Sequence, residues 1–167
     1  SGPFDRAAVH RYLQGKGQPG DLVFFNVLSL AGTYERYRTP TDPAWSYALT
    51  WDPVVEPLAT AVEARLRPAA RNYDRLWFVL YKGTSEANGP LKSWLDANFY
   101  PAFGQWEDDI LYLLYVTPAP TVALPLEARF GDSIQLASVA YTEQTSATGG
   151  VSLALTWEAV ARPQTDY

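Results

Sequence analysis

Three short runs of mostly apolar residues constrain the fold of this chain more than any other feature of its sequence. They are Leu22–Val27, Arg75–Tyr81 and Ile110–Val116. A strand whose two faces are both covered reads as a continuous apolar run rather than as an alternating one. Helical patterns separate these runs, and helices alternating with buried strands indicate a parallel sheet joined by right-handed crossovers. The sequence therefore predicts an α/β fold: a three-layer, Rossmann-like sheet with at least three parallel strands.

The segments between the runs carry the signals of helices. Residues 52–53 are Asp-Pro, a typical helix start, because Asp accepts free N–H groups at the N-cap and Pro loses no bond at the first helical position. Apolar residues then recur at helical spacing as far as Leu66. A second helix is predicted to start at residues 88–90 and a short one to cover residues 5–14. No element is predicted in the Pro-, Tyr- and Trp-rich stretch 29–52.

The C-terminal part follows a different pattern. Prolines interrupt residues 118–125, whereas 133–142 alternates partially and 151–158 alternates cleanly between apolar and polar residues. Alternation of period two is typical of a strand with one covered face. These strands are expected to pack on the α/β part or to begin a β-sandwich-like module. The predicted organisation is an α/β domain over 1–117, a Pro-rich linker over 118–130 and a short antiparallel β segment over 131–167.

Composition excludes several kinds of chemistry. The 167 residues carry a formal net charge of −5, so the sequence predicts no nucleic-acid partner. The absence of Cys excludes disulfides, thiolate zinc sites and iron–sulfur clusters. The longest apolar runs are far shorter than the roughly 18–20 residues that cross a bilayer. The absence of Met indicates an excised or processed piece of a longer protein.

Three motifs with possible chemistry favour ordinary structural roles. Residues 15–20 match G-x-G-x-x-G, but the dinucleotide-binding motif needs a strand before it and a helix after it, and the predicted order here is the reverse. His10 is the only histidine, and no nucleophile is predicted to converge on it. The acidic run Glu107–Asp109 supplies three carboxylates, whereas a hard cation takes six or more oxygens. No catalytic residue, metal site or cofactor is therefore predicted.

Aromatic residues gather in the stretch after the first apolar run, where open α/β sheets bind ligands at the carboxyl ends of their strands. Such side chains can stack on sugars, and they can equally be buried over the sheet. A binding function here would make the chain a secreted carbohydrate-binding module. The candidate ligand-binding residues are Tyr34, Glu35, Arg36, Tyr37, Arg38, Trp45, Tyr47 and Lys82.

Three pairs of segments carry a family resemblance. They are DRAAV at 5–9 with QPGDLV at 18–23, RLWFVL at 75–80 with LKSWLD at 91–96, and FGDSIQL at 130–136 with GGVSLALTWEA at 149–159. Together they resemble the C-terminal region that follows the last membrane helix in bacterial glycosyltransferases related to the dolichyl-phosphate-mannose protein mannosyltransferases. The last pair resembles the start of the β-rich module that follows in such proteins.

The resemblance implies a role without catalysis by this chain. It implies a soluble extracytoplasmic domain of a membrane-embedded glycosyltransferase that uses a lipid-linked sugar, with the catalytic acids in a loop between membrane helices elsewhere. The expected partner is a glycan or an acceptor polypeptide, and the membrane is reached only through flanking helices outside this sequence. The expected location is the extracytoplasmic face of the cell membrane.

Overall fold

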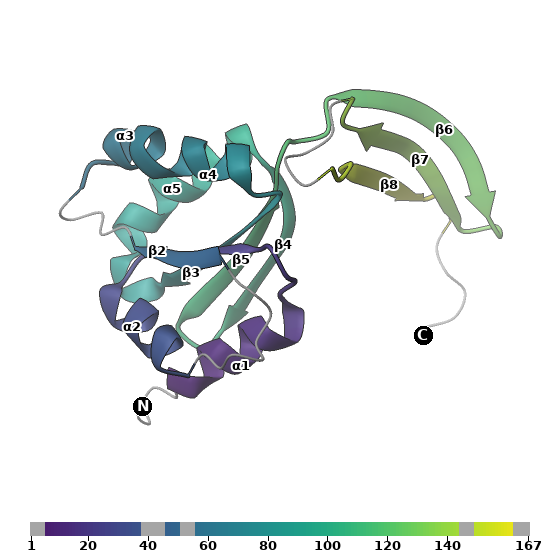
Figure 1. Cartoon of the computed structure of the whole chain (residues 1–167). Coiled ribbons are helices and arrows are strands. Elements are labelled where there is room, and N and C mark those ends of the chain that lie inside the picture. The colour runs from purple at the N-terminus through teal and green to yellow at the C-terminus, as the bar shows by residue number, and fades with distance from the viewer. Residues whose placement is uncertain (1–5, 38–45, 51–55, 144–148, 162–167) are drawn as a thin grey trace.

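The computed structural model of the chain describes residues 6–37, 46–50, 56–143 and 149–161 (Figure 1). The strands are β1 (Leu22–Phe25), β2 (Ser46–Thr50), β3 (Arg75–Tyr81), β4 (Tyr100–Glu107), β5 (Ile110–Val116), β6 (Val122–Phe130), β7 (Ile134–Tyr141) and β8 (Leu153–Ala159). The helices are α1 (Arg6–Lys16), α2 (Leu28–Tyr37), α3 (Leu58–Ala61), the π-helical turn η1 (Val62–Leu66), α4 (Arg67–Asn72), the 3-10 turn η2 (Lys82–Thr84) and α5 (Ser85–Asn98). The strands form a five-stranded sheet in the order β2-β1-β3-β5-β4 and a three-stranded sheet in the order β6-β7-β8.

The five-stranded sheet is mixed, so the prediction of a Rossmann-like parallel sheet is wrong. β1 pairs in parallel with β2 and β3, but β5 runs antiparallel to both of its neighbours, β3 and β4. The third apolar run therefore forms a strand in the opposite direction from the one expected. The reason is the hairpin at residues 108–109: α5 leads from β3 into β4, and a two-residue turn then reverses the chain into β5. The crossover joins β3 to β4, and β5 inserts between them.

β4 was missed because it is an exposed edge strand. Most of its side chains are exposed, and its sequence contains Pro101 and Gly104 rather than a continuous apolar run. Pro is tolerated at sheet edges, where a backbone N–H is not needed for a ladder. The signals of a buried strand are therefore absent from β4, although it decides the direction of β5.

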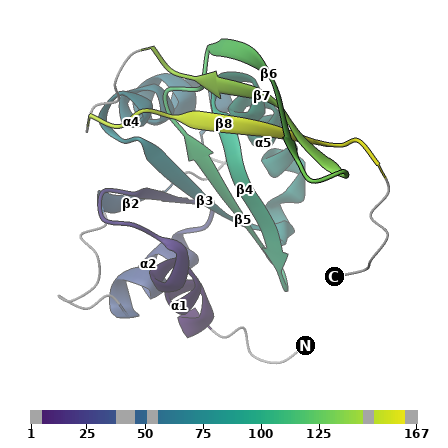
Figure 2. The same cartoon turned by 90° about the vertical axis from the view of Figure 1, so that its right-hand side faces the viewer.

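Helices cover both faces of the five-stranded sheet (Figures 1 and 2). On one face, α1 and α2 pack against alternate side chains of β1, β3 and β5, and on the other η1, α4 and α5 pack against the remaining ones. The first core includes Leu13, Phe25, Tyr34, Trp77, Val79 and Tyr112. The second includes Phe24, Leu66, Phe78, Leu91, Leu95 and Tyr115. Burial on both faces explains the continuous apolar runs of β1, β3 and β5.

The three-stranded sheet extends away from the α/β part, beyond the end of β5 (Figure 1). β6 lies in the segment for which the sequence predicts a Pro-rich linker, and it pairs antiparallel with β7, which in turn pairs antiparallel with β8. The short connection between the two sheets is fixed by hydrogen bonds from Thr117 N to Asp74 O (2.9 Å) and from Thr121 N to Tyr141 O (3.1 Å). In the described part of the chain, no helix has the length and apolar character needed to cross a membrane.

Candidate functional site

The aromatic residues predicted to bind a ligand do not all lie in a loop. Tyr34 lies on α2 and is buried, with its ring centroid 5.5 Å from that of Phe25 and 5.8 Å from that of His10. Its ring is therefore part of the core between α2 and the sheet. The other predicted residues of α2 are the half-buried Glu35 and the exposed Arg36 and Tyr37. Arg38 and Trp45 lie outside the described residues, and Tyr47 lies in β2. A glycan site in this region stays a prediction.

Lys82 is joined to the β4–β5 hairpin. Its Nζ forms an ion pair with Asp109 Oδ1, and its backbone N donates to Asp109 O at 2.9 Å. The hydrogen bond to Asp109 raises the pKa of Lys82 above its ordinary value. Lys82 therefore contacts the acidic run Glu107–Asp109 through Asp109. No group of three or more His, Asp or Glu side chains placed to hold a metal ion occurs within the described residues.

Two asparagines close the carboxyl edge of β1 and β3, where a ligand was expected. Asn26 Nδ2 donates to Asn88 Oδ1 at 2.9 Å, and Asn88 Nδ2 donates to Tyr81 O at 3.0 Å. Tyr81 N in turn donates to Asn26 Oδ1 at 2.9 Å. The hollow beside this network, between Arg65 and Leu91, has a volume of about 10 Å³, which is room for about one water molecule. These amides hold the backbone at the edge of the sheet.

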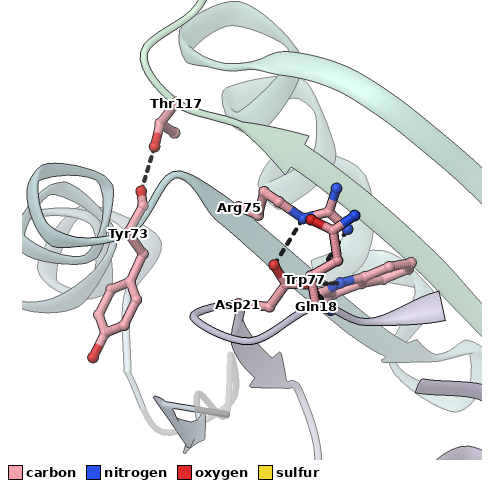
Figure 3. A network of polar contacts seen from close by, with 6 residues as sticks. All are labelled: Gln18, Asp21, Tyr73, Arg75, Trp77 and Thr117. Atoms are coloured by element: carbon pink, nitrogen blue, oxygen red, sulfur yellow. Dashed lines mark hydrogen bonds and ion pairs between the residues drawn. The ribbon is translucent and has the colours of Figure 1, made fainter. Parts of the chain in front are cut away.

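A buried carboxylate ties together the opposite end of the same strands (Figure 3). Asp21 is 1% exposed and accepts hydrogen bonds from Arg75 Nε (2.7 Å), Trp77 Nε1 (2.7 Å) and Gln18 N (3.0 Å). Nearby, Thr117 Oγ1 donates to Tyr73 O at 2.5 Å. Because Leu22 pairs in register with Leu76, Asp21 and Arg75 start neighbouring parallel strands. All of these contacts join parts of the fold, so the network is structural.

The most distinctive surface of the molecule is one face of the three-stranded sheet. Residues directly opposite each other in antiparallel strands share a face, so the observed registers assign every paired side chain to one side. One side carries only apolar residues, and we call it the apolar face. Its members are Val122, Leu124, Ala128, Phe130, Ile134, Leu136, Val139, Tyr141, Leu153, Leu155, Trp157 and Ala159.

Much of the apolar face is open to solvent. Six of its large side chains are between 46% and 60% exposed, namely Leu124, Phe130, Ile134, Leu153, Leu155 and Trp157. Phe130 of β6 and Trp157 of β8 belong to the two edge strands, yet their ring centroids lie 5.1 Å apart at an interplanar angle of 62°. The two rings therefore meet across β7 and form a continuous surface.

The opposite side of this sheet has a different character. Its paired members are Ala123, Pro125, Arg129, Gln135, Ser138, Ala140, Ala154, Thr156 and Glu158. These side chains are small, polar or charged, as on the solvent side of an antiparallel sheet. The residues of this sheet therefore alternate as in a layer that is covered on one side, although its apolar side is exposed here.

Sequence reasoning found part of the apolar face. The alternation at 151–158 predicts that Val151, Leu153, Leu155 and Trp157 share one side of a strand. Leu153, Leu155 and Trp157 do so in β8, whereas Val151 precedes the strand. Sequence reasoning missed the contribution of β6, because the prolines of that segment indicated a linker. A register shift between Leu136 and Ser138 also brings Leu136 and Val139 onto the same side, which simple alternation does not predict.

The fold and this surface define a mixed α/β domain with an attached antiparallel sheet. Comparison with known proteins adds no family or relative: no family model, no curated protein and no solved structure matches the chain.

Proposed function

We propose that this chain is an interaction domain without a catalytic role, and that the apolar face of β6–β8 is its docking surface. The single observation that carries the proposal is the exposure of six large apolar side chains on one side of a sheet whose other side carries small, polar or charged ones. Contiguous exposed apolar patches of more than a few hundred Å² mark interaction sites in folded proteins. The α/β part serves as the scaffold on which this sheet is presented.

The exposed area of the apolar face is large enough for a docking surface. Half-exposed aromatic and branched side chains each leave on the order of 100 Å² in water, which gives the six together on the order of 600 Å². Covering that area represents on the order of 10 kcal/mol of transfer free energy, of which association retains only a part.

The chemistry of the surface favours another β-sheet as the partner. Two sheets pack face to face when each presents alternate apolar side chains, and the layers lie about 10 Å apart. An anionic lipid surface is disfavoured, because the charged residues of the three-stranded sheet and its turns are mostly acidic. They are Glu127, Arg129, Asp132, Glu143 and Glu158.

We further propose that the domain serves a membrane-embedded bacterial glycosyltransferase at the extracytoplasmic face of the membrane. The support for this is the resemblance of the segments at 5–23, 75–96 and 130–159. On this proposal, docking helps to present a glycan or an acceptor polypeptide to the membrane-embedded part. The test is the reading frame around these residues: it should encode hydrophobic spans upstream, and their absence would contradict the glycosyltransferase context while leaving the docking surface untouched.

The docking surface itself is tested with a dye that binds exposed apolar surface, anilinonaphthalenesulfonate. At low protein concentration, Leu155→Glu should reduce dye fluorescence, because it places a charge on the apolar face. Thr156→Glu is the matched control, since Thr156 is the next residue on the same strand and lies on the polar side. Equal dye binding by both variants and the unchanged protein would refute the proposed docking surface.

A further inference from the structure

We infer that the partner of the apolar face is the same face of a second copy of this chain, so that two three-stranded sheets form a six-stranded sandwich. The inference rests on the proposed docking function and names its partner. In such a dimer the β6–β8 sheets lie face to face, and the two α/β parts remain outside the sandwich.

The area of the apolar face suits a dimer. A standard interface takes about 800 Å² from each partner. The six most exposed side chains supply on the order of 600 Å², and half-buried members such as Leu136, Val139 and Tyr141 add to it. The face alone therefore comes close to the area that a stable pair of chains requires.

The face is also complementary to itself. None of its paired residues is charged, and the Tyr141 hydroxyl is its one polar group, so a two-fold pair buries no charge. Phe130 and Trp157 lie toward one end of the face, and Leu124, Leu153 and Tyr141 lie toward the other. A two-fold axis between the layers and across the strands places the Phe130 and Trp157 end of each copy over the Leu124 and Leu153 end of the other copy. This arrangement is isologous, as in most homodimers.

Charges around the face give the dimer a characteristic salt dependence. Glu127, Asp132 and Glu143 lie in the same sheet or its turns, and each chain has a net charge of −5. Like charges on the two copies repel each other, and salt screens this repulsion. Raising the ionic strength should therefore tighten the dimer, whereas an association held by ion pairs would weaken.

The primary experiment is sedimentation equilibrium of the full chain from micromolar to millimolar concentration. The unchanged protein should pass from one chain to two, and dye binding per chain should fall as the dimer forms. Leu155→Glu should weaken the dimer at least about tenfold, because a buried unpaired carboxylate is costly. Thr156→Glu should leave it unchanged apart from the effect of added net charge. Leu124→Glu, on a different strand of the same face, repeats the test if Leu155→Glu disturbs folding, which circular dichroism would reveal.

The absence of natural cysteines allows the arrangement of the dimer to be measured directly. A nitroxide label at Ser138→Cys points away from the apolar face. Layers about 10 Å apart, with two labels directed outward, place the labels roughly 25 Å apart in the sandwich, whereas pairing of two β8 edges places them roughly 15 Å apart. The shorter distance would overturn the inference.

Failure of the inference can be told apart from failure of the proposed function. A chain that stays monomeric at millimolar concentration, but whose dye binding falls in Leu155→Glu, keeps its docking surface and lacks the second copy as partner. A dimer that Leu155→Glu and Leu124→Glu leave intact uses another surface, which also overturns the inference.

Discussion

At the scale of single residues, Asp21 shows how one buried charge aligns two strands. Its carboxylate accepts hydrogen bonds from Arg75 and Trp77 of β3 and from the backbone of the loop before β1. Asp21→Asn should lower the free energy of unfolding by about 2–4 kcal/mol, because the amide places a donor against these donors and leaves the guanidinium without its charge partner. Urea unfolding followed by fluorescence measures this loss.

The matched control is another pair between an arginine and a carboxylate. Arg67 Nε contacts Glu63 Oε1 at 2.8 Å on the surface of the helical segment. Both side chains are largely exposed, so Glu63→Gln should change the free energy of unfolding by less than about 0.5 kcal/mol. Equal losses from Asp21→Asn and Glu63→Gln would contradict the structural role assigned to the Asp21 network.

Tyr115 and Asp96 make the stability depend on pH at both extremes. Hydrogen bonds from Lys92 and from the Tyr115 hydroxyl, both 2.6 Å long, lower the pKa of Asp96. Burial, followed by the hydrogen bond to Asp96, raises the pKa of Tyr115 well above its ordinary value. The contribution of Asp96 to the free energy of unfolding is present above the ordinary carboxyl pKa and is lost as the pH falls through the lowered pKa. That of Tyr115 is present below pH 10.0, the ordinary tyrosine pKa, and is lost as the pH rises beyond it.

The alkaline side gives the clearer measurement, because Asp96 is partly exposed and its contribution is small. Phenolate absorbance of the unchanged protein and of Tyr115→Phe should coincide through the ordinary range of tyrosine titration. The two curves should separate only when the chain unfolds, since the buried hydroxyl stays protonated in the native state. A phenolate that titrates near the ordinary pKa before unfolding, and disappears in Tyr115→Phe, would contradict this burial.

At the scale of elements, the β4–β5 turn determines the topology of the main sheet. Asp108 has a φ of 50°, in the left-handed region that most L residues avoid and that Asp and Asn tolerate best. Asp108→Val should therefore destabilise the protein by about 1–2 kcal/mol, and Asp108→Asn should remain within about 0.5 kcal/mol of the unchanged chain. Urea unfolding of the two variants measures these free energies. Equal free energies of unfolding for Asp108→Val and Asp108→Asn would show that a β-branched residue causes no strain in the turn.

Sequence patterns identified the strands that are buried on both sides and the two alternating strands β7 and β8, but they missed the exposed strands β4 and β6. The runs at 22, 75 and 110 correspond to β1, β3 and β5, because burial of both faces requires apolar residues at every position. The edge strand β4 and the exposed strand β6 lack that requirement and contain prolines. Since the direction of β5 depends on β4, missing one edge strand was enough to make the predicted sheet topology wrong.

The candidate site was predictable to a similar extent. Alternation in 151–158 indicates one strand with a single apolar side, but a docking surface exists only when neighbouring strands align their apolar sides. That alignment depends on the pairing of β6 with β7 and on the register shift near Leu136, which are properties of the folded sheet. By contrast, the aromatic cluster after β1 could not be assigned from composition, because aromatic rings serve equally well in a core, as Tyr34 does.

At the scale of the whole molecule, the two sheets differ in how they are stabilised. The five-stranded sheet lies between two helical layers, whereas the three-stranded sheet has large apolar side chains in water. An isolated small sheet gains little from burial, so its backbone should open at a lower free energy than the core strands. Native-state hydrogen exchange at low protein concentration should therefore show faster exchange for the β7 amides than for the central strand β3.

The protein concentration should affect the hydrogen exchange of the two sheets differently. If the apolar face is covered by a second copy, the protection of β7 should increase as the protein concentration rises, while the protection of β3 should stay constant. The added protection follows the fraction of chains that are bound, since a partner that binds only the folded sheet stabilises it by mass action. Leu155→Glu should remove the concentration dependence and Thr156→Glu should preserve it. Protection of β7 equal to that of β3 at every concentration would mean that the two sheets open as a single cooperative unit.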